Sequence, residues 1–98
     1  MYTMAAYLVG QITVNDNDLW QQYIAGVTES LVPFESKIIF RGSRTAVFAG
    51  ENDRDLIVVI EFSDQATLEN WFHSEKYQSL IPLRDQAADV VITTYHAY

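Results

Sequence analysis

The segment that decides the fold is Leu56-Ile57-Val58-Val59-Ile60-Glu61-Phe62, a run of β-branched and aromatic residues that is typical of a β-strand. Side chains alternate between the two faces of a strand, so Ile60 and Phe62 lie on one side, and Ile57 and Val59 lie on the other. Both sides are apolar. A strand of this kind is expected in a sheet that is covered on both faces.

A broken helix is predicted after this strand. Asp64 is a suitable N-cap for a helix whose apolar residues Leu68, Trp71 and Phe72 share one face. Ser74 can cap a second, short helical piece. Pro82 cannot lie inside one unbroken helix, because it lacks an amide donor and its ring clashes with the preceding turn. We therefore expect the helix to restart near Pro82 and to run to about Ala88.

The first part of the chain is predicted to form a strand, a helix and a second strand. Residues 6–14 are rich in β-branched and aromatic side chains, and Asn15 or Asp16 can cap the helix that follows. That helix carries apolar residues at helical spacing and ends before Pro33. Residues 37–41 form the second strand. Gly42-Ser43, directly after them, is expected to make a bulge or kink.

The rest of the chain completes an α+β pattern. The second strand is expected to continue over residues 45–49, and residues 51–55 form a polar turn before the strand at 56–62. Residues 90–95 are the fourth strand. The order β-α-β-β-α-β predicts a ferredoxin-like fold with a four-stranded antiparallel sheet, as one domain over residues 1–98.

The two apolar strand faces predict a homodimer. In this fold the helices cover one face of the sheet, yet the first strand places Leu8 and Ile12 on one side and Tyr7 and Val9 on the other. A chain of 98 residues has no further helix to cover the second face. We expect a second copy to do so, sheet against sheet. The alternative is a monomer with an apolar open face.

Composition excludes several classes of protein. The net charge of -7, with only six Lys and Arg side chains, argues against binding to nucleic acid or to anionic membranes. Apolar runs are far shorter than the ~20 residues that cross a bilayer. The absence of cysteine excludes disulfides and thiolate chemistry. No basic region precedes the apolar residues near the N-terminus, so we expect no secretory signal and a cytoplasmic protein.

An ordered set of motifs resembles one family. The set comprises residues 6–14 with Asp16, Trp20 and Tyr23; Arg41-Gly42; residues 58–62; and Trp71-x-x-Ser74-x-x-Tyr77-x-x-Leu80-x-x-x-Arg84 with Ala87. From about Ala6 to Thr94 the chain is similar to the DUF1330 family, small bacterial domains of unknown function in the dimeric α/β-barrel superfamily. The residues before Ala5 resemble a short extension, in which Met4 is an alternative start.

The resemblance implies a ferredoxin-like homodimer with its helices outside and a cavity between helices and sheet. The wider superfamily includes cofactor-free quinone-forming monooxygenases, haem-degrading enzymes, chlorite dismutase-like haem proteins, small isomerases and binding modules. The family has no agreed activity. The fold therefore supplies candidate functions and does not choose among them.

His73 has a structural and a functional interpretation. It immediately precedes Ser74, where it can interact with the last carbonyls of a helix. Alternatively it is a general acid or base, because its ordinary pKa lies near neutral pH. Neither His73 nor His96 has a carboxylate three or four residues after it, so we expect no metal site. Nothing in the sequence favours haem or another cofactor.

Tyr77 and Arg84 are seven residues apart, which is two turns along one face of a continuous helix. A buried arginine needs a partner, and Glu61 or Asp85 could supply a structural ion pair. The functional alternative is a clamp for a carboxylate or enolate. Arg41, and Arg44 beside it, could add positive charge at the same end of the sheet.

The aromatic residues Trp20, Tyr23 and Trp71 belong either to the core or to a pocket for a small aromatic or quinone-like molecule. The hypothesis is a cofactor-independent enzyme acting on a small anionic or aromatic molecule, in which Arg84 neutralises developing charge and His73 moves a proton. The predicted cavity residues are Trp20, Tyr23, Arg41, His73, Tyr77 and Arg84. The alternative is a non-catalytic dimeric binding or sensor module, and a purely structural dimer comes third.

Overall fold

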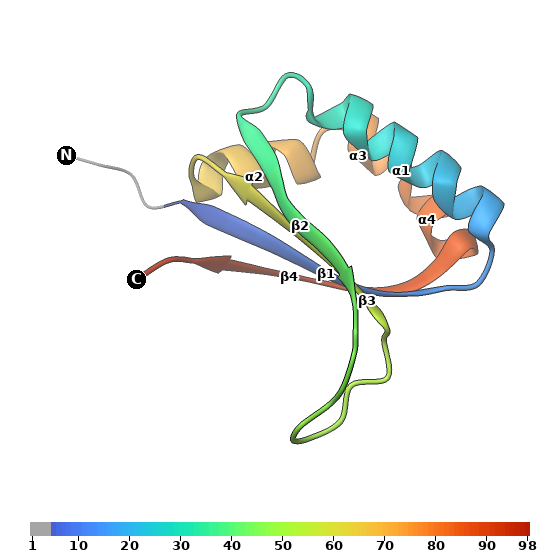
Figure 1. The fold of residues 1–98 in the computed structure, drawn as a ribbon. Coiled ribbons are helices and arrows are strands. Elements are labelled where there is room, and N and C mark those ends of the chain that lie inside the picture. The colour runs from blue at the N-terminus through green and yellow to red at the C-terminus, as the bar shows by residue number, and fades with distance from the viewer. Residues whose placement is uncertain (1–4) are drawn as a thin grey trace.

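Four antiparallel strands form one sheet in the order β2-β3-β1-β4, and the helices lie together on one face of it (Figure 1). The computed structural model describes residues 5–98, and the extension expected before Ala5 lies outside them. The strands are β1 Ala6–Val14, β2 Ser36–Ser43, β3 Leu56–Phe62 and β4 Ala88–His96. The chain order is β-α-β-β-α-β with the second helix broken, so the predicted ferredoxin-like architecture is confirmed.

The helices begin where the sequence predicts. They are α1 Asn17–Leu31, α2 Gln65–Phe72, α3 Glu75–Gln78 and α4 Ile81–Ala87. The Asp16 carboxylate accepts the Leu19 N–H at 3.1 Å, and the Asp64 carboxylate accepts the Thr67 N–H at 2.7 Å. Pro82 lies in the first turn of α4, where a backbone N–H has no acceptor within the helix, so the N–H that proline lacks costs no hydrogen bond. The predicted caps and the predicted break in the second helix are confirmed.

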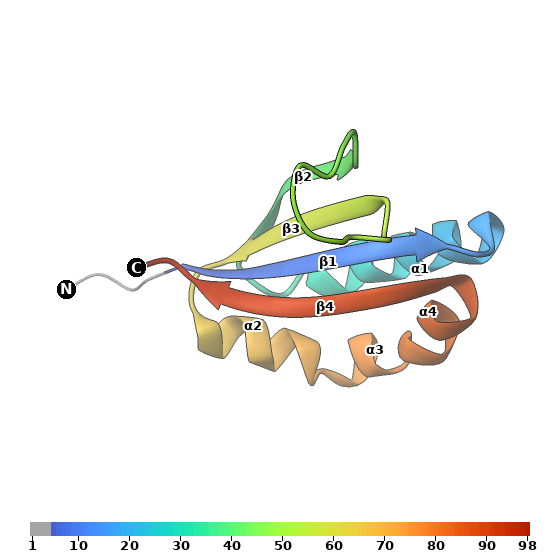
Figure 2. The ribbon, with the colours of Figure 1, turned by 90° about the horizontal axis from the view of Figure 1, so that it is seen from below.

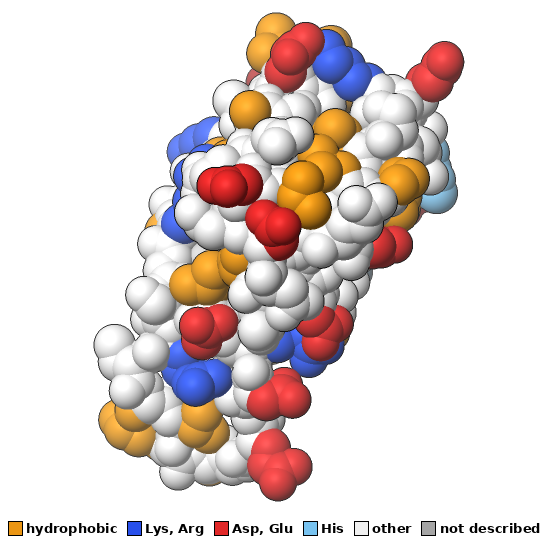
Figure 3. Space-filling model, turned by 90° about the vertical axis from the view of Figure 1, so that its right-hand side faces the viewer, with side chains coloured by type: hydrophobic (Ala, Val, Ile, Leu, Met, Phe, Trp, Pro, Cys, Tyr) orange, Lys and Arg blue, Asp and Glu red, His pale blue; other side chains and the backbone are white. Residues whose placement is uncertain are grey.

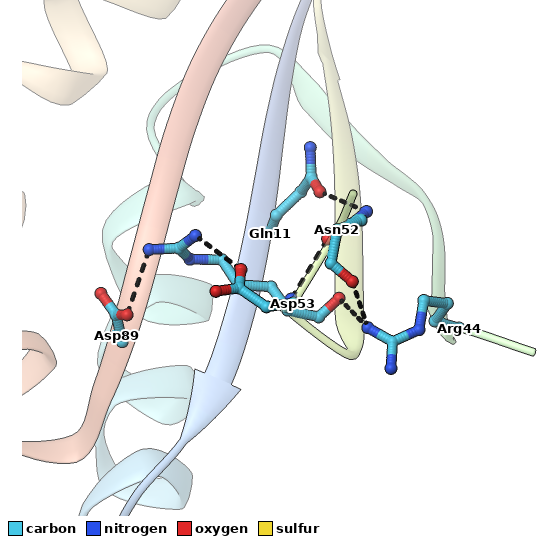
Figure 4. A network of polar contacts seen from close by, with 6 residues as sticks. Gln11, Arg44, Asn52, Asp53 and Asp89 are labelled. Carbon is cyan, nitrogen blue, oxygen red and sulfur yellow. Dashed lines mark hydrogen bonds and ion pairs between the residues drawn. The ribbon is translucent and has the colours of Figure 1, made fainter. Parts of the chain in front are cut away.

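The segment between β2 and β3 differs from the prediction. Residues 45–49 do not continue β2 but belong to an irregular loop, in which Gly50 has a φ of 78°. The Arg44 guanidinium donates to the backbone carbonyls of Asn52 at 2.8 Å and Arg54 at 3.1 Å, and these bonds close the loop (Figure 4). The bulge also lies elsewhere, because the register shifts between Ile38 and Phe40 instead of at Gly42-Ser43.

The core lies between the sheet and the helices. Buried residues of the sheet include Leu8, Ile60 and Phe62, and Trp71 and Tyr77 cover them from the helix side. The Trp71 ring lies 4.4 Å from the Tyr77 ring and 5.5 Å from the Phe62 ring, measured between centroids. This aromatic layer ties α2 and α3 to the sheet.

The opposite face of the sheet, called the open face below, is the face seen in Figure 2. Leu8 and Ile12 of β1 are buried under the helices, so Val9 projects to the open face. Val59 of β3 pairs with Val9 and therefore lies on the same face. Phe40 of β2 pairs with Val59 and lies there too. Phe40 is 50% exposed. The expected second apolar face is therefore present.

The surface carries its charge in a mixed pattern. On the side shown in Figure 3, acidic side chains are spread between hydrophobic patches, while Lys and Arg side chains form small separate groups. Within residues 5–98, no helix combines the length and the apolar character that a membrane crossing needs.

A close contact between α1 and the turn after α3 generates the first prediction. A Cβ atom on Gly26 would lie 2.6 Å from Leu80 Cδ2. Gly26→Val should lower the free energy of unfolding by about 1–3 kcal/mol, since inserted methyl groups force packed helices apart. Urea unfolding measures this change.

Ala25→Val is the matched control, because Ala25 is exposed on the same helix and gains the same β-branched side chain. Combining Gly26→Val with Leu80→Ala should recover part of the loss. A Gly26→Val protein as stable as the wild type would show that the two helices are not in tight contact.

Candidate functional site

A cavity of about 340 Å³ lies between α1 and the sheet. Its walls come from β1, β3 and β4 below, from α1 above, and from β2 at one side. Gly10 leaves space in the centre of β1, where a Cβ atom would lie 3.1 Å from Val58 Cγ1. The principal apolar and aromatic wall residues are Leu8, Ile12, Trp20, Tyr23, Ile24, Val27, Ile38, Leu56, Val58, Ile60, Trp71, Tyr77, Val90 and Ile92.

Two buried tyrosines of the cavity wall are bonded to each other through their hydroxyls. Tyr23 Oη of α1 lies 2.8 Å from Tyr77 Oη of α3, and either hydroxyl can be the donor. Arg84 Nη1 of α4 donates to Tyr77 Oη at 3.1 Å. Trp20 stacks on Tyr23 with a centroid distance of 5.1 Å, which holds the Tyr23 ring in place. Three helices therefore meet at one hydrogen-bonded group.

Burial affects the pKa of one member of this group, the Tyr23 hydroxyl. Burial in the apolar wall raises the pKa of Tyr23 well above its ordinary value, with the nearby Tyr77 hydroxyl acting in the same direction and Arg84 opposing it. The Tyr23 hydroxyl thus remains protonated at neutral pH. It can donate a hydrogen bond but cannot act as a phenolate base.

The exposed side of the cavity is more polar. Arg41 and Ser43 come from β2, and Thr28 comes from α1; all three are exposed and line the cavity. Arg41 pairs across the sheet with the lining residue Val58, which places both side chains on the helix side of the sheet. Among residues 5–98, the lining side chains include no carboxylate, histidine or lysine.

Four of the six predicted site residues line this cavity: Trp20, Tyr23, Arg41 and Tyr77. His73 and Arg84 instead border a second, more open pocket beside α2, α4 and β4, together with Gln65 and Glu69. His73 is exposed at the C-cap of α2, where its backbone N–H donates to the Glu69 carbonyl at 2.9 Å. Because this bond comes from the backbone, it does not decide between the two interpretations of the His73 side chain.

Arg84 forms the structural ion pair that the sequence allows, and its partner is Asp85. The Arg84 Nη2 to Asp85 Oδ1 distance is 3.2 Å. The other suggested partner, Glu61, is wrong, because Glu61 accepts from Tyr7 Oη at 2.8 Å and faces Lys37 Nζ at 3.8 Å. Arg84 reaches Tyr77 although the helix between them is broken.

Arg44 does not join Arg41 near the cavity. It bonds the carbonyls of the loop after β2, next to Asn52, which donates to Gln11 Oε1 at 3.0 Å (Figure 4). Arg54 of the same loop pairs with Asp89 of β4 at 3.1 Å. These residues fasten the loop to the sheet and take no part in the cavity.

Sequence reasoning missed Gly10, Thr28 and Ser43 as cavity residues. Gly10 carried a signal, since a glycine inside a strand often marks a place where something else approaches the backbone. Thr28 and Ser43 carried none. Within residues 5–98, no three His, Asp or Glu side chains are grouped so that they could hold a metal ion.

Solved structures share this fold at low sequence identity. A protein of unknown function from Rhodopseudomonas palustris has a TM-score of 0.81 at 11% identity, with 97% of this chain and 83% of that chain covered. SnoaB, a cofactor-independent oxygenase from Streptomyces nogalater, has a TM-score of 0.71 at 7% identity, with 98% and 95% covered. A dimeric ferredoxin-like protein of unknown function from Thermobifida fusca has a TM-score of 0.67 at 14% identity, with 99% and 95% covered.

These likenesses establish the fold and leave the activity open. No functionally curated protein matches the sequence. The model of the domain of unknown function DUF1330 matches residues 5–97, nearly the whole chain. The chain therefore belongs to the DUF1330 family, as its motifs indicate.

Proposed function

We propose that this protein binds a small, largely apolar molecule in the cavity between α1 and the sheet. The observation that carries the proposal is the cavity itself, whose volume of about 340 Å³ falls in the range of ligand sites. Its walls are aliphatic and aromatic, with a few polar groups at defined places. A flat ring system could contact Trp20, Tyr23 and Trp71, since offset and edge-on ring contacts are favourable.

The polar residues indicate which groups such a molecule carries. Arg41 is the cationic side chain at the cavity, and its planar fork suits a carboxylate or a similar anion. The proposed ligand is an aromatic or comparably flat molecule with one anionic group directed toward β2.

Catalysis is the second candidate. The fold is shared with SnoaB, which is described as a cofactor-independent oxygenase. Against this candidate, the lining residues among residues 5–98 include no histidine or carboxylate to move a proton. His73 lies outside the cavity, and Arg84 contacts it through Tyr77. A binding or sensor module is therefore the better supported function.

The proposed assembly is a homodimer through the open faces of two sheets. This face is apolar because it carries Val9, Phe40, Val59 and Val91. In the single chain Val91 is 39% exposed. The T. fusca protein with this fold is described as dimeric. Contact between two such faces would remove a continuous apolar surface from water.

Filling the cavity should abolish binding of a ring-shaped probe. Ile24 lines the cavity, so Ile24→Trp should weaken the binding of 1-naphthol by at least about tenfold, a loss of roughly 1.4 kcal/mol. Isothermal titration calorimetry measures the affinity.

Gln22→Trp is the control, because Gln22 is exposed on the same helix and does not line the cavity. It should bind 1-naphthol as the wild type does. Equal affinity of the Ile24→Trp protein and the wild type would place the ligand elsewhere and contradict the proposal.

A turnover assay separates binding from catalysis. A cofactor-independent oxygenase could convert 1-naphthol and dioxygen to 1,4-naphthoquinone and water, a reaction that balances without another reactant. For a binding module, we expect oxygen consumption with the protein to equal consumption without it. Quinone formation in proportion to protein concentration, lost in Ile24→Trp, would instead establish the enzyme.

A charge on the open face should break the dimer. Sedimentation of the wild type should give twice the chain mass of 11.2 kDa, and Val59→Glu should give the single-chain mass. An unpaired carboxylate buried between two sheets would lose several kcal/mol of hydration. Gln22→Glu adds the same charge on α1 and should remain dimeric. A wild type that sediments at 11.2 kDa at micromolar concentration would exclude the assembly.

A further inference from the structure

The hydroxyl pair of Tyr23 and Tyr77 has more hydrogen-bond donors than acceptors. Tyr77 Oη accepts one hydrogen from Arg84 Nη1 at 3.1 Å. The two hydroxyls then share a single hydrogen bond at 2.8 Å. Each tyrosine has one hydroxyl hydrogen, and only one of the two is used in that bond.

The remaining hydrogen has no partner in the described chain. If Tyr77 donates to Tyr23, the hydrogen of Tyr23 is left over; if Tyr23 donates to Tyr77, the hydrogen of Tyr77 is left over. Within residues 5–98, neither hydroxyl makes a hydrogen bond besides these two. Tyr23 is 7% exposed and Tyr77 is 0% exposed, so bulk water reaches neither freely. A buried donor without an acceptor is unfavourable.

Both tyrosines belong to the cavity wall, and Tyr23 is the one that retains exposed surface, so an acceptor for the spare hydrogen can lie beside Tyr23. We propose that the spare hydroxyl hydrogen is donated to an oxygen atom of the bound molecule, with Arg84 as a positioning residue behind it. This inference rests on the proposed binding of a small molecule in the cavity. It adds a requirement: the ligand presents a carbonyl, carboxylate or phenolate oxygen toward Tyr23 and Tyr77.

Arg84 influences how the two tyrosine hydroxyls share their hydrogens. A guanidinium only donates, so its bond occupies an acceptor position of Tyr77 Oη and leaves the Tyr77 hydrogen free to be donated to Tyr23. Its positive charge polarises the hydroxyls and strengthens the donor at the end of the chain. Asp85 holds the guanidinium from the solvent side, at 3.2 Å from Nη2. The site therefore favours an oxygen with negative charge over a neutral hydrocarbon of equal size.

Two probes of the same ring size test the inference. 1,4-Naphthoquinone carries acceptor oxygens, and naphthalene carries none. Calorimetry on the wild type should show about fivefold tighter binding of the quinone, since one hydrogen bond contributes about 1 kcal/mol net of the hydration that it replaces. In Tyr23→Phe combined with Tyr77→Phe this preference should vanish, and the naphthalene affinity of the same variant is the reference that corrects for any change in the shape of the cavity.

Infrared spectroscopy separates the positioning role of Arg84 from a structural one. Binding to the wild type should lower the stretching frequency of one quinone carbonyl, because a hydrogen bond weakens the C=O bond. Arg84→Met should reduce this shift. Tyr98→Phe is the matched control for the tyrosine variants, since Tyr98 is exposed and does not line the cavity. It should retain both the preference and the shift.

The outcomes distinguish this inference from the proposed function. If both probes bind the wild type equally well, or if the preference survives in the double variant, the cavity remains a binding site and the donor chain is disproved. If neither probe binds, the proposed function itself fails, and this inference fails with it.

Discussion

The packing of Trp71 and Tyr77 between α1 and the sheet is the contact on which the rest of the structure depends. Trp71 Nε1 donates to Ser30 Oγ of α1 at 3.0 Å, and Tyr77 Oη bonds Tyr23 Oη of α1 at 2.8 Å. These two bonds join the first helix to the broken second helix across a stretch of more than forty residues. Because the same aromatic rings form a wall of the cavity, the core and the candidate site cannot be separated: what holds the helices together also shapes the space beneath them.

The cavity persists because the fold prevents its collapse. Protein interiors are normally packed as densely as organic crystals, and an empty apolar space lowers stability. Here Gly10 removes a side chain from the centre of the sheet, while the contact of Gly26 with Leu80 sets how closely α1 approaches the turn after α3. A Cβ atom at position 10 would lie 3.1 Å from Val58 Cγ1, so even a small side chain there would require Val58 to shift. A hollow kept open in this way is the physical argument for a ligand, independent of any relative.

Local signals in the sequence were sufficient for most of the fold. The side chains of Asp16 and Asp64 cap their helices through bonds to residues three positions away, and such short-range bonds leave a recognisable pattern. The failures involve partners that are distant in sequence. Strand propensity over residues 45–49 did not reveal that Arg44 would close a loop through the carbonyls of Asn52 and Arg54. In the same way, no spacing rule shows that Glu61 bonds to Tyr7, 54 positions away. His73 was grouped with the cavity because its ordinary pKa suits proton transfer and it lies near Tyr77 in the sequence, but it occupies the C-cap of α2, where it is exposed.

β3 connects the two proposals made for this protein. Val58 and Ile60 form part of the cavity wall, whereas Val59 between them lies on the open face. A dimer that packs against Val59 would hold β3 from below, just as a ligand would hold it from above. If each event restricted the strand, each would lower the entropy cost of the other, and this would couple assembly to binding without any change of shape. Such coupling suits a sensor more directly than an enzyme, because a sensor needs ligand occupancy to alter an interaction with another protein chain.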